Sequence, residues 1–114
     1  MYNKYLIEVY TGILHQPATA EAIAERELTN RSTPQTNAWY VWTLFNNNKK
    51  DKATEIYGKA VSGKPLEGLE LYYMGQMMRG SKKEYNAKSF LEASYKNRYD
   101  LSPAKIKELE KEFK

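Results

Sequence analysis

The sequence predicts an all-α protein of about seven helices, arranged as stacked antiparallel pairs. The main observation is that residues 34–67 return in altered form as residues 68–101, at an offset of 34 residues. A period of this length is typical of repeated supersecondary units. Apolar residues also recur at spacings of three and four, which indicates amphipathic helices. Between the two copies, residues of similar size stand at equivalent positions, as in the pairs Ala53 and Ala87, Ala60 and Ser94, Tyr57 and Leu91, Tyr40 and Met74, and Leu44 and Met78.

The composition is that of an ordinary soluble protein. The chain has 114 residues, enough for one domain or a short array, and 41% of them are hydrophobic. Its net charge of +4 is a weak indication of nucleic-acid binding, and the lack of cysteine excludes disulfides and thiolate sites. The sequence shows neither a signal peptide nor an apolar stretch long enough to span a membrane. We therefore expect a soluble chain, cytoplasmic by default, that is exported only if it is a piece of a longer precursor.

The first third of the chain predicts two helices, over residues 2–14 and about 20–29. A breaker over residues 15–17 separates them, because Pro17 cannot continue a helix interior. We expect Thr19 to cap the second helix, and the small residues Ala20 and Ala24 to let it approach its neighbour closely.

The middle third predicts a helix over residues 34–46, followed by another that reaches Val61. Thr33 is the expected N-cap of the first helix, with Pro34 at its first position. The asparagines that follow tolerate the left-handed conformation that ends a helix. We expect Asp51 to cap the next helix, and a glycine followed by a proline ends it.

The last third predicts helices over residues 66–78, 83–96 and 103–113. Gly75 lies inside the first of these, where glycine costs about 1 kcal/mol relative to alanine, so we expect tight packing against the next helix. Ser102 and Pro103 mark the start of the last helix. Its single apolar stripe is what a repeat array needs in a solvating cap.

These repeated residues resemble the tetratricopeptide repeat (TPR) family, whose helix pairs recur every 34 residues with small residues at fixed positions. Asn37 departs from the family pattern by replacing a large aromatic residue, and Val41 by replacing a glycine. Residues 1–33 are a degenerate copy, and residues 102–114 contain the capping helix. The matching residues are Tyr40, Leu44, Ala53, Tyr57, Ala60 and Pro65 in one copy, and Leu71, Met74, Gly75, Met78, Tyr85, Ala87, Leu91 and Ser94 in the next.

The resemblance implies a right-handed superhelix in which the first helix of each pair lines a concave groove that binds a peptide, a helix or a partner domain. Some members of the family hold a C-terminal carboxylate with lysine, asparagine and arginine. Here only Lys4 fits that set, while Glu8 and Trp39 stand where asparagine is needed, so we expect this clamp to be absent. The positions that match the family's groove are Lys4, Glu8, Ala38, Trp42, Phe45, Tyr72, Gln76 and Arg79, with Asn46 at the rim.

Several of these residues also have a purely structural interpretation. Trp42 and Phe45 are equally explained by packing between repeats, and Tyr72 by a half-exposed position.

Solvated turns and helix faces explain the basic clusters, because RNA binding requires lysines that converge on one face with exposed aromatic residues. These clusters are Lys49, Lys50 and Lys52, then Lys82 and Lys83, then Lys105 and Lys107.

No set of residues predicts catalysis. His15 is the only histidine and stands beside a proline in a predicted turn, with no nucleophile arrangement near it. The acidic residues of the last helix look like an ordinary helix surface, and no phosphate-binding loop is present. We therefore expect no enzyme activity, no cofactor and no metal site.

The sequence predicts a scaffold or adaptor module that binds an unidentified protein or peptide through the groove. Two alternatives are a C-terminal structural segment of a longer repeat protein, and a nucleic-acid-binding helical repeat. Because no capping helix precedes the first pair, we also expect Tyr2, Leu6 and Tyr10 to leave apolar surface for another chain, for example in a homodimer.

Overall fold

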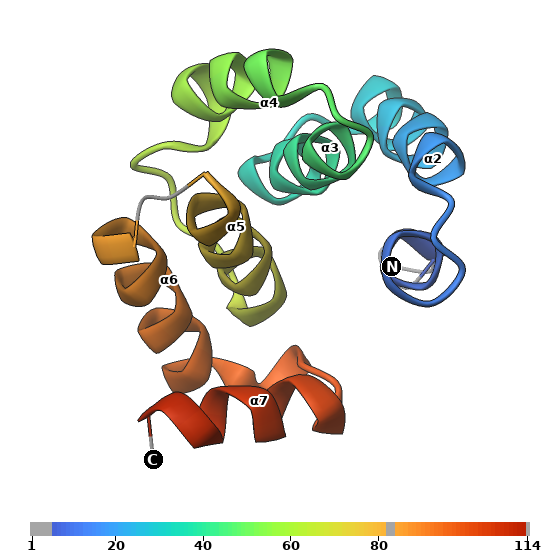
Figure 1. The fold of residues 1–114 in the computed structure, drawn as a ribbon. Coiled ribbons are helices and arrows are strands. Elements are labelled where there is room, and N and C mark those ends of the chain that lie inside the picture. The colour runs from blue at the N-terminus through green and yellow to red at the C-terminus, as the bar shows by residue number, and fades with distance from the viewer. Residues whose placement is uncertain (1–5, 82–83, 114) are drawn as a thin grey trace. The chain divides into compact units, whose positions relative to one another are not determined.

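The computed structural model of the chain describes residues 6–81 and 84–113 (Figure 1). Helices and connecting segments make up this part of the chain and it contains no strand, so the predicted all-α class is confirmed. Each of the seven predicted helices has a counterpart. The chain divides into two compact units, Met1–Pro65 and Leu66–Lys114, which are described separately.

The first unit consists of short helices around α3. Residues 6–8 are helical and continue into a π-helical turn, η1 (Val9–Ile13). Helices α2 (Pro17–Asn30) and α3 (Pro34–Asn46) pack against each other as a pair. Helix α4 (Lys50–Ile56) continues into a second π-helical turn, η2 (Tyr57–Val61), and both pack on α3. The core of this unit consists mainly of small and aliphatic side chains, among them Ile7, Ala20, Ala24, Val41, Leu44 and Ala53.

The predicted start of two helices was wrong. Pro17 is the first residue of α2 and not part of a breaker, so Thr19 lies inside the helix. This is physically natural, because the first helical residue needs no N–H donor and proline already has the required φ angle. Helix α4 begins one residue before Asp51, which therefore lies in the first turn and is not the cap. In the first turn, its carboxylate still interacts favourably with the positive end of the helix dipole.

The second unit is a helix pair followed by a shorter helix. Helices α5 (Gly68–Gly80) and α6 (Glu84–Lys96) make the most extensive packing in the chain. The expected close contact at Gly75 is confirmed, because a Cβ atom there would lie 2.6 Å from Cδ2 of Leu91. A 3₁₀ turn, η3 (Arg98–Asp100), leads to α7 (Pro103–Phe113), which packs against α6 (Figure 1). The methionines of α5 are buried and fill the core, as predicted: Met74, Met77 and Met78.

Three residues with positive φ angles mark chain reversals after helices. Asn48 (φ 62°) follows α3, where the sequence predicted the left-handed conformation, and Gly63 (φ 76°) follows η2, where it predicted a glycine that ends the helix. His15 (φ 52°) does the same after η1, which gives it a conformational role in the turn.

None of the described helices has the length and apolar character needed to cross a membrane.

Candidate interaction surfaces

A pair of stacked aromatic rings forms the first candidate surface, on α3. The ring centroids of Trp42 and Phe45 are 6.2 Å apart, and the ring planes differ by 18°. Their spacing of three residues places them on one side of the helix. Both side chains are half-buried, so part of each ring faces solvent. They were predicted as groove residues, and the structure brings them together.

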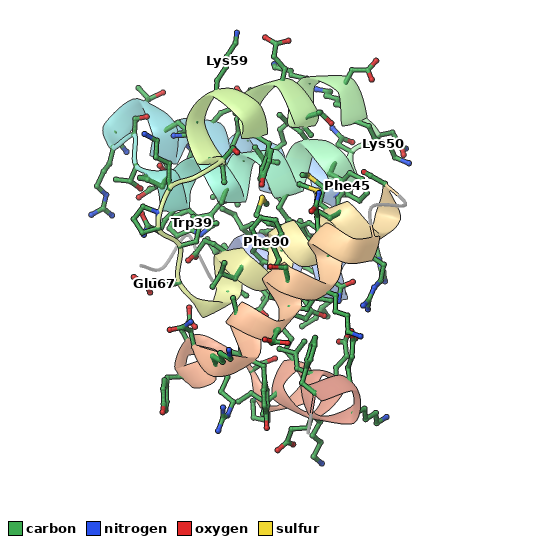
Figure 2. All side chains as sticks on the ribbon, turned by 90° about the vertical axis from the view of Figure 1, so that its left-hand side faces the viewer. Trp39, Phe45, Lys50, Lys59, Glu67 and Phe90 are labelled. Carbon is green, nitrogen blue, oxygen red and sulfur yellow. The ribbon has the colours of Figure 1, made fainter. Side chains whose placement is uncertain are left out.

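Neighbouring side chains hold this aromatic pair in place. Nε1 of Trp42 donates a hydrogen bond to Oγ1 of Thr11 in η1 at 3.4 Å. The side chain of Asn46 donates to the backbone carbonyl of Trp42 at 2.8 Å. Nζ of Lys50 in α4 lies over the Phe45 ring, 5.4 Å from its centroid, and both residues are labelled in Figure 2. We call these five residues the α3 face. It offers aromatic area bordered by a positive charge.

The other predicted groove positions of the first unit do not add to the α3 face as described. Lys4 is outside the described residues. Ala38 is fully buried and offers no surface to a partner. Glu8 is half-buried on the first helix, one turn before Thr11. Trp39, which departs from the carboxylate-clamp pattern, is 3% exposed and belongs to the core.

Three predicted groove residues of the second unit lie on one side of α5, and each contacts a carboxylate of α7. Tyr72 donates from its hydroxyl to Oε2 of Glu108 at 2.7 Å, and Nε2 of Gln76 donates to Oε1 of the same carboxylate at 3.0 Å. Nη2 of Arg79 lies 3.1 and 3.0 Å from the two carboxylate oxygens of Glu112. Tyr72 is therefore buried, at 8% exposure, and not half-exposed.

These contacts show which residues of α7 face α5. Glu108 meets Tyr72 and Gln76, and Glu112 meets Arg79. One turn before Glu108, Nζ of Lys105 lies 5.5 Å from the centroid of the Tyr72 ring. We call the side of α5 formed by Tyr72, Gln76 and Arg79 the α5 face.

Sequence reasoning missed the partners of both faces. The acidic residues of α7 were interpreted as plain helix surface, whereas Glu108 and Glu112 contact α5. Their spacing of four residues, which places both on one side of a helix, was the available signal. Neither Thr11 nor Lys50 carries a comparable signal, because their contacts to α3 depend on how the helices pack.

The first basic cluster is engaged within its own unit. Glu21, buried on α2, accepts hydrogen bonds from Nζ of Lys49 and Nδ2 of Asn47, each at 2.9 Å. Burial raises the pKa of Glu21, but these bonds and the positive charges of the lysines outweigh it and lower the pKa overall. A hydrogen bond with the Tyr40 hydroxyl raises the pKa of Lys52. Lys49, Lys50 and Lys52 thus face different groups, which gives no support for a convergent nucleic-acid surface; Lys82 and Lys83 lie outside the described residues.

Three carboxylates gather at the start of α5, where they cap the helix. Ligand-type oxygens of Glu67, Glu70 and Asp100 lie within 4.8 Å of one another. The side chain of Asp100 accepts from the N–H of Leu69 at 3.2 Å, and that of Glu70 accepts from the N–H of Glu67 at 3.3 Å. Unpaired N–H groups and a positive dipole occur at every helix start, so capping accounts for this cluster without a metal ion.

Comparisons of the chain with protein-family models, curated proteins and solved structures found no significant match. The resemblance to tetratricopeptide repeats therefore rests on the repeated residues and stays a prediction.

Proposed function

We propose that the protein is a non-catalytic interaction module that binds a protein or peptide segment through the α3 face. The observation that carries this proposal is the stacked, half-buried pair of Trp42 and Phe45. Tryptophan is enriched among residues that dominate binding energy, because a rigid ring buries much area at a small entropic cost. The hydrogen bond to Thr11 holds the Trp42 ring in advance, which lowers the cost of binding further.

The chemistry of the α3 face indicates the kind of segment that fits. The exposed parts of the two rings suit an apolar anchor residue. Lys50 suits a neighbouring carboxylate, since its ammonium group lies over the Phe45 ring within cation–π distance. A peptide with an apolar residue next to an acidic residue therefore matches the face. The helical-repeat pattern of the sequence supports the same class of function.

A display selection tests the proposal. The full chain is immobilised and used to select binders from a random peptide library. We expect the selected peptides to lose about tenfold or more in affinity when Trp42→Ala is introduced, the loss typical of a hot-spot residue. Tyr99→Ala is the matched control, because Tyr99 is 92% exposed and lies in the other unit. Selected peptides that bind the Trp42→Ala chain as well as the wild type would contradict the proposal.

A further inference from the structure

The contacts described between α7 and α5 are made by polar side chains, whereas α7 packs against α6. Glu108 accepts two hydrogen bonds from α5, and Glu112 contacts Arg79 through both carboxylate oxygens. Among the residues of α7, only Leu109 is buried. Phe113 is half-buried and stacks on Tyr95 of α6, with 6.4 Å between the ring centroids. The specific contacts between α7 and α5 are therefore made by a row of charged and polar groups.

A helix held in this way separates from its unit more easily than a core helix does. The 11 residues of α7 are fewer than an isolated helix needs to be stable in water. By contrast, α5 buries nine of its residues. Local opening costs least where few apolar contacts are lost, so α7 opens at a lower free energy than α5.

We propose that the α5 face is a recognition site for an amphipathic helix that presents two carboxylates four residues apart, and that α7 is its resident occupant. A helix with the same pattern from a partner protein replaces α7. This inference goes beyond the proposed function by giving the module a second surface and naming its partner class. It uses none of the residues of the α3 face, so either proposal can fail while the other stands.

The geometry specifies which side chains a partner helix would present to the α5 face. Arg79 pairs with one carboxylate, and the Tyr72 hydroxyl and Gln76 amide together hold the other. The ring of Tyr72 takes a cation one helical turn earlier, as it does with Lys105. A partner helix therefore carries Lys, Glu and Glu at the spacing of Lys105, Glu108 and Glu112, with an apolar residue next to the first glutamate.

The covalent link of α7 to the rest of the chain determines how strongly a free partner helix competes with it for the α5 face. A segment on a short linker acts at an effective concentration on the order of millimolar, so a free helix binds weakly while α7 remains intact. Weakening the contacts of α7 in the chain should open the site to a free helix of native sequence. This relation gives the proposal a direct test.

The test uses a fluorescent peptide of residues 102–114 as the probe and the full-length chain as the receptor. We expect the Glu108→Ala/Glu112→Ala chain to bind this peptide at least about tenfold more tightly than the wild-type chain does, because each lost charged hydrogen bond weakens the resident helix. Adding Arg79→Gln to that chain should reverse the gain by about tenfold. Fluorescence anisotropy measures both affinities.

A control peptide separates recognition from general charge attraction. Lys107→Gln and Lys111→Gln change exposed residues of α7, so a peptide with both changes should bind about as well as the native one. A peptide with Glu108→Ala and Glu112→Ala should not bind. Equal binding of these two peptides, or binding that does not depend on Arg79, would overturn the proposal.

Hydrogen exchange provides a measurement that needs no variant. We expect the backbone amides of α7 in the wild-type chain to exchange faster than those of α5, because α7 opens separately. Amides of α7 that exchange only as slowly as the α5 core would overturn the proposal, since the resident helix would then leave only when the whole unit unfolds. Circular dichroism of the receptor variants confirms that they remain helical.

Discussion

At the scale of single residues, two glycines in helical segments have opposite surroundings. A Cβ atom at Gly75 would lie 2.6 Å from Leu91 and 3.3 Å from the carbonyl oxygen of Ala87. A Cβ atom at Gly58, in η2, would meet nothing within 4 Å. Gly75 therefore allows α5 and α6 to approach, whereas Gly58 contributes only flexibility to the unfolded chain.

We expect opposite effects when each glycine is replaced by alanine. Gly75→Ala should lower the free energy of unfolding by about 1–3 kcal/mol, because the added methyl group overpacks the contact between α5 and α6. Gly58→Ala should raise it by about 0.4–1 kcal/mol, because the unfolded chain loses conformational freedom. Urea denaturation measures both changes. Equal effects of the two substitutions would show that the packing of α5 on α6 is looser than described.

Glu21 gives a prediction about pH. Its pKa is lowered in the folded chain by its bonds to Lys49 and Asn47, so deprotonation favours folding. Its contribution to stability is fully present above the ordinary glutamate pKa and is lost as the pH falls through the lower folded value.

Glu21→Gln should therefore lower the free energy of unfolding at neutral pH. On acidification, that free energy should then fall less than it does in the wild type. Unfolding curves from neutral to acidic pH measure this difference. Glu55→Gln is the control, because Glu55 is exposed and forms only an i,i+4 pair with Lys59. A Glu21→Gln chain with the full acid sensitivity of the wild type would contradict the assigned pKa direction.

At the scale of elements, the sequence predicts both bounds of α3 and of α7, and the start of α3 has a visible local cause. Thr33 caps it: its Oγ1 accepts from the N–H of Thr36 at 3.1 Å, and its own N–H donates to the Thr36 hydroxyl at 2.8 Å. This reciprocal pair and the proline that follows Thr33 are local, so the sequence alone predicts the start of the helix.

We expect Thr33→Ala to cost about 1 kcal/mol of unfolding free energy, the typical loss for an N-cap residue. Thr29→Ala is the matched control. Thr29 is exposed inside α2 and its hydroxyl only bonds back to the carbonyl of Glu25, so its loss should change stability little. Thermal unfolding followed by circular dichroism compares the two. A similar cost for both would remove the special role of Thr33.

Other elements were predicted less well because their causes are not local. The residue before α2, Gln16, makes no side-chain cap, so nothing in the sequence distinguishes a helix start at Pro17 from a turn. The π-helical turns η1 and η2 have no sequence mark that separates them from α-helix. The sequence predicts α7 and its apolar stripe, but its acidic contacts depend on where the helix docks.

At the scale of the whole molecule, the 34-residue recurrence predicts the all-α class and the pair of α5 and α6, whereas in the first unit α2 packs most extensively on α3, across the predicted boundary between repeats. Trp42 and Phe45 come together as expected, because they share one side of a helix. Ala38 does not contribute, since it is fully buried. The α5 face is occupied by α7, which no repeat pattern reveals, because the last helix follows none of the repeated positions.

Exposed apolar side chains at the end of η1 predict association of the chain. Ile13 and Leu14 are 72% and 48% exposed, whereas Leu6 and Tyr10, expected to face a partner, are half-buried, and Tyr2 lies outside the described residues. We expect the mass measured by light scattering to rise with concentration for the wild type, and to stay at the monomer value for Ile13→Ser/Leu14→Ser. Tyr99→Ser is the control. A wild-type chain that stays monomeric at every concentration would contradict this.

The central claim is that the α3 face binds a protein segment through Trp42. Isothermal titration calorimetry of a selected peptide against the wild-type, Trp42→Ala and Tyr99→Ala chains tests it most directly. We predict an affinity loss of about tenfold or more for Trp42→Ala and none for Tyr99→Ala. Equal affinities of the three chains for the peptide would contradict the claim, because binding would then occur away from the α3 face.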